Sequence, residues 1–223
     1  MMLGDSFLFG WHLAAKETIS KTLERRLPDY EFYNLGMVGW GLDQMFLSYE
    51  KYVDLIDPHI IVLTYISDDL PRIYEAFRAD DDINKPSFSL RANQLVLRRV
   101  QSHPHFMQYV TNNSIIANKF YVAYKDHDVT KLANALLAEL ISKTRERREE
   151  LIVLRLPLLW DDPDNDPDKS FAKLFAEHNI PYIDMRKHMP LSPQSYGFDG
   201  HLSAEGAKNV AEFMTRLDAL SRP

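Results

Sequence analysis

Four short segments of this chain carry side chains of the kinds that perform acyl transfer. A serine hydroxyl is a weak nucleophile until a base within hydrogen-bonding distance takes its proton and a third group orients that base. Ser6, His201 and Asp199 supply these three types, so we interpret them as nucleophile, base and orienting acid. The segments are Gly4-Asp5-Ser6-Phe7, residues 34–41, Ser67-Asp68-Asp69-Leu70 and Asp199-Gly200-His201-Leu202-Ser203.

Acyl transfer also needs hydrogen-bond donors for the negative charge that develops on the carbonyl oxygen. Gly36 suits a close backbone N–H because it has no side chain, and the N–H of Ser6 would be a second donor. Each residue also has an ordinary structural interpretation. Taken alone, Ser6 suits a helix cap, Gly36 a turn, and Asp199-Gly200-His201 a turn that enters a helix. The order of the segments and their places after predicted strands favour the chemical interpretation.

The elements that must position these residues alternate between strands and helices. The apolar runs 59–65 and 151–156 predict buried parallel strands. Shorter strands are predicted at 31–34 and 181–184, and helices at 16–27, 42–56, 114–124, 130–149, 171–178 and 204–220. This alternation predicts a three-layer α/β/α fold with a mostly parallel sheet, in which loops at the carboxyl ends of the strands gather to form a site.

One domain is expected over residues 1–223, because α/β folds of this length are commonly single. Residues 71–112 break the alternation and include the acidic run 80–82. Because this stretch directly follows the Ser67–Leu70 segment, we interpret it as an insertion that forms a lid or selects the substrate.

The order of the four segments resembles that of the SGNH/GDSL hydrolase family, and the resemblance extends from Gly4 to about Ala211. It implies an SGNH-type, flavodoxin-like sandwich without a cofactor or metal. It also implies an acyl-enzyme on Ser6, with Ser6, Gly36 and position 68 around the oxyanion.

Two departures from the family pattern concern the acid and one oxyanion donor. The family places Asp three residues before His, but here position 198 is Phe and Asp199 is two before His201. In an extended chain residues two apart point to the same side, so Asp199 still suits the role, with Asp184 as the spare candidate.

The second departure is Asp68, which stands where the family has an Asn donor. An ionised carboxylate has no proton to give and repels developing negative charge. Three outcomes stay open: burial keeps Asp68 protonated, Ser67 donates instead, or the site is slow or inactive. In the purely structural alternative, Asp68 and Asp69 cap the following turn.

Four aromatic residues lie beside these segments, namely Trp11, His12, Trp40 and Tyr65. They suit either the wall of an acyl or sugar pocket or the cap of the core. The acids of residues 162–168 alternate as in a calcium loop, but Pro167 and Lys173 stand where an EF-hand needs Gly and Glu, so no metal site is expected.

Composition narrows the function classes. The net charge of −6 disfavours binding to nucleic acid, and no apolar run approaches the roughly 20 residues that cross a bilayer. The absence of Cys excludes thiol nucleophiles but leaves the compartment open: cytoplasmic if the chain begins at Met1, exported if a signal lies upstream. The oligomeric state is also open.

These observations predict a serine esterase acting on a small-molecule or glycan ester, such as an O-acetyl group on a carbohydrate. An O-acyltransferase that modifies a glycan is the first alternative, because only the acceptor of the acyl group differs. A binding domain that keeps the fold but is impaired at Asp68 is the second.

Overall fold

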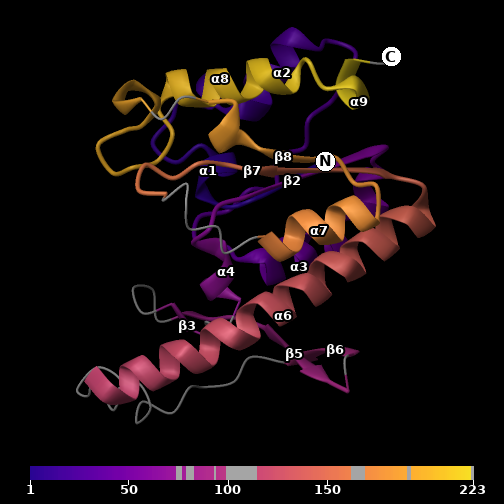
Figure 1. The fold of residues 1–223 in the computed structure, drawn as a ribbon. Coiled ribbons are helices and arrows are strands. Elements are labelled where there is room, and N and C mark those ends of the chain that lie inside the picture. The colour runs from indigo at the N-terminus through magenta and orange to yellow at the C-terminus, as the bar shows by residue number, and fades with distance from the viewer. Residues whose placement is uncertain are drawn as a thin grey trace.

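A four-stranded parallel sheet forms the centre of the computed structural model (Figure 1). Its strands lie in the order β1 (Met2–Leu3), β2 (Ile60–Tyr65), β7 (Glu150–Arg155) and β8 (Tyr182–Asp184). The register pairs Met2 with Val62 and Val62 with Ile152. The structure describes residues 1–73, 77–78, 83–92, 94–98, 115–161, 169–189 and 192–221.

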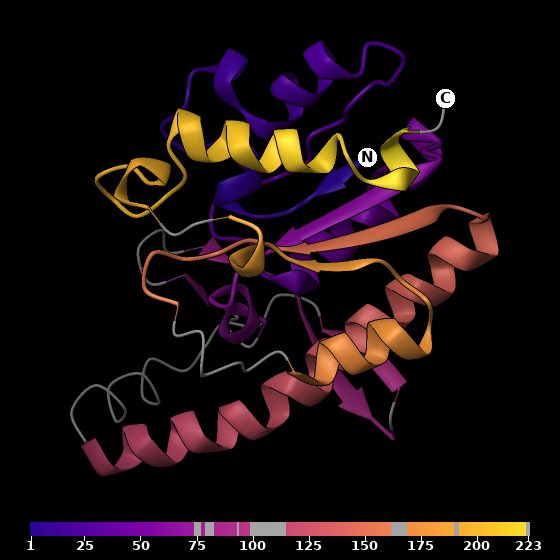
Figure 2. The same ribbon diagram turned by 45° about the horizontal axis from the view of Figure 1, so that its top comes forward.

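Two helical layers cover the sheet, as Figures 1 and 2 show. One face carries α1 (Ser6–Phe9), α2 (Ile19–Arg26), α8 (Ala204–Met214) and α9 (Asp218–Ser221). The other carries α3 (Leu42–Ile56), α6 (Ile115–Arg147) and α7 (Lys169–Glu177). Short 3-10 helices are η1 (Ala15–Glu17), η2 (Met185–Lys187) and η3 (Pro193–Ser195). The predicted three-layer α/β/α fold is therefore confirmed.

Each central strand contributes to two hydrophobic cores, because successive side chains point to opposite faces of the sheet. In β2, Ile61 and Leu63 face the core under α3 and α6, whereas Val62 faces the core under α2 and α8. In β7, Val153 and Ile152 divide in the same way. Burial on both faces explains the continuous apolar runs of these strands.

Three predicted elements differ from the structure. The helices predicted at 114–124 and 130–149 are one helix, α6, because no Pro or Gly interrupts the residues between them. The strand predicted at 31–34 is reduced to one parallel bridge between Asn34 and Met2. The last helix divides into α8 and α9, and the hydroxyl of Thr215 donates to Glu212 O where α8 ends.

The predicted insertion at 71–112 is described in part. It contains β3 (Phe77–Arg78) paired with β4 (Ile83–Asn84), and β5 (Ser87–Arg91) paired with β6 (Gln94–Arg98), each pair antiparallel. Residues 74–76, 79–82, 93 and 99–114 lie outside the described residues, as do residues 162–168 of the acidic loop. Among the helices of the described chain, none is long and apolar enough to cross a membrane.

Candidate active site

Ser6 stands at the first position of α1, immediately after the short strand β1. Asp5 caps this helix, and its Oδ1 accepts a hydrogen bond from Phe7 N at 2.9 Å. Both Ser6 and Asp5 are buried. The N–H of Ser6 has no acceptor among the described residues, as is usual for the first N–H of a helix.

His201 reaches Ser6 from the other end of the chain. The loop before α8 carries it, and Ser203 begins that helix by accepting from Gly206 N at 3.1 Å. His201 Nε2 lies 2.8 Å from Ser6 Oγ, and the ring packs against Phe7 with 5.2 Å between centroids. The structure therefore brings the predicted nucleophile and base within hydrogen-bonding distance.

Asp199 completes this chain of contacts. Its Oδ2 lies 2.9 Å from His201 Nδ1, and its Oδ1 accepts from the backbone N–H of His201 at 3.2 Å. The segment is a tight turn at Gly200, with a φ of 83°, rather than the extended chain that the sequence predicts. Glycine favours this conformation, and a Cβ there would lie 2.5 Å from the Trp160 ring.

The charge of Asp199 is set by these contacts. Desolvation works against the charged form, but the hydrogen bonds and charge of His201 outweigh it and hold the pKa of Asp199 below its usual value. An ionised Asp199 accepts from Nδ1–H, which leaves Nε2 as the acceptor facing Ser6. The spare candidate, Asp184, is instead held by Arg186 at 2.7 Å.

His12 also contacts the acid. Its Nε2 lies 3.2 Å from Asp199 Oδ2, so two imidazole rings meet one carboxylate oxygen. The backbone of His12 is left-handed, with a φ of 64°, and its ring lies between those of Trp11 and Phe198, at 4.9 and 5.4 Å. The sequence placed His12 beside the site but did not predict a contact with Asp199.

A buried network of two carboxylates and one guanidinium lies next to Ser6. Arg72 Nη1 lies 2.5 Å from Asp69 Oδ1, 3.4 Å from Asp5 Oδ2 and 3.3 Å from Trp40 O. Asp5 Oδ2 is also 3.3 Å from Ser6 Oγ. Burial raises the pKa of both carboxyls, that of Asp69 strongly because the Asp5 charge adds to the effect. Arg72 is not among the residues predicted from the sequence, although its spacing from Asp69 suits an i,i+3 pair.

Gly36 does not offer its N–H as predicted. That N–H donates to Asn34 Oδ1 at 2.9 Å, while the Asn34 amide donates to Leu8 O at 2.8 Å. A Cβ at Gly36 would lie 2.6 Å from Phe9 N and 3.0 Å from Asp5 O. Gly36 thus permits close packing against α1, and its donor is already used.

Asp68 lies at the start of α4 (Asp69–Arg72), and its side chain makes no capping hydrogen bond. Burial, and after it the charge of Asp161, raises its pKa, although Arg72 acts in the opposite direction. Ser67 donates to Asp161 Oδ1 at 3.0 Å, so its proton is not free to serve in place of Asp68. Asp69 does act as a local cap, accepting from Ile66 N at 2.9 Å.

The four aromatic residues predicted beside the site lie in different environments. Tyr65 is buried in the core, with its hydroxyl 3.2 Å from that of Tyr182, which fits its interpretation as a cap of the core rather than as the wall of a pocket. Trp40 lines a cavity that Ser6 does not line, and Trp11 is exposed beside His12. Trp160, which is not among the residues predicted from the sequence, is 60% exposed and packs on the turn at Gly200.

Comparison with solved structures shows similarity of fold at low sequence identity. A lipolytic protein of the G-D-S-L family from Desulfitobacterium hafniense DCB-2 matches with a TM-score of 0.59 and 13% identity over 96% of each chain. The psychrotrophic esterase EstA from Pseudoalteromonas sp., inhibited by monoethylphosphonate, gives 0.59 and 12% over 99% of this chain and 97% of its own.

A lipase/acylhydrolase from Enterococcus faecalis gives a TM-score of 0.53 and 16% identity over 96% of this chain and 92% of its own. No protein-family model and no curated protein sequence matches the chain. The agreement along nearly the whole length shows that this chain has the fold of the G-D-S-L, or SGNH, hydrolases, as its sequence resemblance predicts.

Proposed function

We propose that this protein is a serine esterase that hydrolyses small acyl esters. The observation that carries the proposal is the continuous line of contacts from Ser6 Oγ through His201 to Asp199, at 2.8 and 2.9 Å. These distances suit proton transfer from a hydroxyl to a base whose ring is oriented by a carboxylate.

The proposed reaction has two halves. Ser6 Oγ attacks the ester carbonyl carbon while His201 Nε2 takes the hydroxyl proton, and Asp199 stabilises the imidazolium. The carbon–oxygen bond to the alcohol then breaks, and His201 gives its proton to the leaving oxygen. In the second half water attacks the acyl-enzyme, His201 takes the proton of the water, and the acid departs as Ser6 regains its proton.

The oxyanion requires donors other than Gly36. The N–H of Ser6 supplies one, and we assign the second to Gly39, whose backbone is left-handed with a φ of 72°. Its neighbours are anchored beside the nucleophile: Met37 N donates to Gly4 O, and Trp40 O accepts from Arg72. The N–H of Gly39 has no acceptor in the described part of the chain.

His12 is a positioning residue in this proposal. Asp199 is partly exposed, at 22% of its side chain, and His12 Nε2 lies 3.2 Å from the oxygen that faces His201. The shortened spacing between Asp199 and His201 leaves that oxygen within reach of both rings. His12 would thus fix the acid in an orientation that the tight turn alone does not enforce.

Aromatic side chains around the turn support a glycan ester as the substrate class. Trp11, Trp160 and Phe198 are exposed by 38%, 60% and 92%; Trp160 and Phe198 lie beside the turn that carries Asp199 and His201, and Trp11 packs on His12. Exposed aromatic faces rimming a polar site favour a ligand with flat apolar surfaces, which sugar rings provide.

The test compares wild type with Ser6→Ala on p-nitrophenyl acetate and on an O-acetylated glycan. Hydrolysis and labelling by a fluorophosphonate in wild type only would support the proposal. Acetyl transfer to an added glycan, without free acetate, would replace it with the O-acyltransferase. Failure of both hydrolysis and labelling in folded wild type would leave the impaired binding domain.

A further inference from the structure

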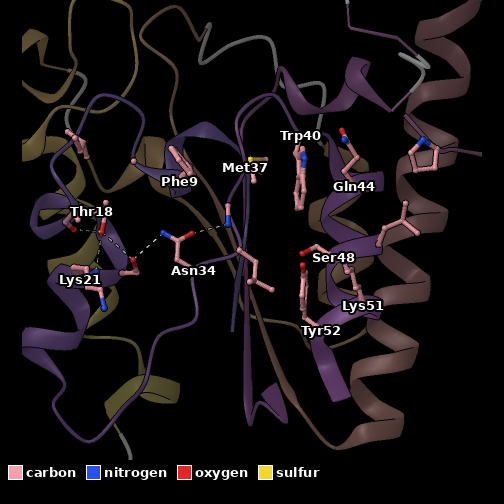
Figure 3. Close-up of a pocket in the computed structure, with 18 residues that line it drawn as sticks. Phe9, Thr18, Lys21, Asn34, Met37, Trp40, Gln44, Ser48, Lys51 and Tyr52 are labelled. Atoms are coloured by element: carbon pink, nitrogen blue, oxygen red, sulfur yellow. Dashed lines mark hydrogen bonds between the residues drawn. The ribbon is translucent and has the colours of Figure 1, made fainter. Parts of the chain in front are cut away.

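A cavity of about 750 Å³ lies at the edge of the sheet, beside Asn34 and Leu35. One side is formed by α2 and the loop before it, and the other by α3 (Figure 3). Neither Ser6 nor His201 lines it. The volume is within the range of sites that hold small molecules.

The packing of Gly36 separates this cavity from the catalytic serine. Gly36 lines the cavity, and a Cβ on it would lie only 2.6 Å from Phe9 N and 3.0 Å from Asp5 O, so no side chain fits on that side. A molecule in the cavity therefore lies behind the turn at Gly36, on the side away from Asp5. It would be a ligand separate from the ester at Ser6.

The walls of this edge cavity are mostly apolar. They include Phe9, Leu13, Leu35, Trp40 and Leu47, and several of these pack against the core, which fixes their positions. Walls of this kind favour an aliphatic chain, since its transfer from water is favourable in proportion to the apolar area it buries.

Ser48 supplies a buried polar group to the wall of the cavity. Its side chain is buried, with 4% of the residue exposed, and its Oγ has no hydrogen bond among the described residues. Figure 3 shows the oxygen directed into the cavity. A buried hydroxyl left unpaired destabilises a protein, and a ligand that pairs with it removes that cost.

The charge of the lining is positive in an acidic protein. Among the described residues, those that line the cavity include Lys21 and Lys51 and no Asp or Glu, although the net charge of the chain is −6. Lys21 is already paired with Glu24 at 2.6 Å. Lys51 has no carboxylate within 4 Å among the described residues, and it follows Ser48 by three residues on the same face of α3.

We propose that the edge cavity binds an aliphatic carboxylate. The chain lies against Leu35, Trp40 and Leu47, and the carboxylate accepts a hydrogen bond from Ser48 Oγ and pairs with Lys51 Nζ. The proposal rests on this geometry alone and does not require Ser6 to act on esters.

Calorimetric titration with decanoate tests the proposal, using decanol as the uncharged probe. Wild type and Ser6→Ala should bind decanoate equally, and Lys51→Gln should weaken it about fivefold. Ser48→Ala should weaken it about tenfold. Decanol should bind more weakly than decanoate and be insensitive to Lys51→Gln. Lys208→Gln, which removes a lysine of α8 outside the cavity, is the matched control.

Three results would overturn the proposal. One is the absence of decanoate binding, and another is equal binding of decanoate and decanol in wild type and Lys51→Gln. The third is loss of decanoate binding when a fluorophosphonate occupies Ser6, which would assign the cavity to the ester site. Labelling of Ser6 itself is read separately, so a failed esterase and an empty cavity give different results.

Discussion

The two sides of Ser6 differ in how fully their hydrogen bonds are made. On the acid–base side, Asp199 accepts from His201 twice and is also met by His12. On the oxyanion side, the donor of Gly36 is taken, and a carboxyl stands at position 68. In the proposed reaction, proton transfer is thus well supported, whereas stabilisation of the oxyanion would depend on backbone N–H groups.

This contrast separates stabilisation of the oxyanion from activation of the nucleophile by the base, two contributions that serine hydrolases normally combine. Removing one oxyanion donor in a serine protease costs about two to three orders of magnitude in turnover. Removing the base costs more, because the nucleophile is no longer activated. Substitutions on the two sides should therefore change kcat by different amounts and in different directions.

The largest effect is expected from His201→Asn. Without a base, kcat for p-nitrophenyl acetate should fall by about 10⁴-fold, with thermal stability little changed. His188→Asn is the matched control, since His188 stacks on Phe213 and does not reach Ser6. Retention of more than a tenth of the activity would show that another group takes the proton.

Asp68→Asn should act in the opposite direction. An amide donates to the oxyanion without a charge, so kcat at pH 8 should rise by up to about 10²-fold. Burial raises the pKa of Asp68, so its protonated form also donates as the pH falls, and the gain should shrink toward acidic pH. The measurement is the ratio of variant to wild-type kcat across pH 5 to 9.

Ser67→Ala is the control for that comparison. The Ser67 hydroxyl donates to Asp161 and not to the oxyanion. The ratio of kcat in Ser67→Ala to kcat in wild type should therefore not change with pH. A rate in Asp68→Asn equal to wild type at every pH would show that the side chain at position 68 does not face the oxyanion.

A smaller effect is expected from His12→Ala. Losing the contact between His12 and Asp199 should lower kcat about fivefold and leave KM unchanged. His12→Gln should restore most of the rate, because its amide places a donor at a similar reach. Phe198→Ala removes only a ring neighbour of His12. If Phe198→Ala and His12→Ala shift KM equally, the two residues contact substrate instead.

The sequence predicts most of the central layer and the three contacting groups of the site. The apolar runs of β2 and β7 predict strands buried on both faces. Residue type and position along the chain predict Ser6 as the nucleophile and His201 as the base. The sequence predicts two helices, at 114–124 and 130–149, where the structure has the single helix α6. The residues between them are mostly polar, but a polar stretch without Pro or Gly does not end a helix.

Contacts that depend on the geometry of turns could not be predicted from residue type and position in the sequence. His12 reaches Asp199 only because both residues lie in tight turns, with left-handed backbone at His12 and Gly200. The use of the Gly36 donor by Asn34 did have a signal, since Asn side chains often bond a backbone N–H two residues on. No such rule predicts the contact of Asp5 with Arg72, which joins the N-terminal cap of α1 to α4.

The smallest effect concerns the pair of carboxyls next to Ser6. Their raised pKa values mean that the folded protein binds more protons than the unfolded chain above the ordinary carboxyl pKa, so stability falls as pH rises from about 4 through the folded pKa values. Asp5→Asn keeps the helix cap, because Asn caps as well as Asp, and it removes the charge that raises the pKa of Asp69. The fall in Tm from pH 5 to pH 8 should therefore be smaller in the variant by about 3 °C. An equal fall in both proteins would mean that Arg72 already neutralises the pair, so that the two carboxyls next to Ser6 carry no electrostatic cost.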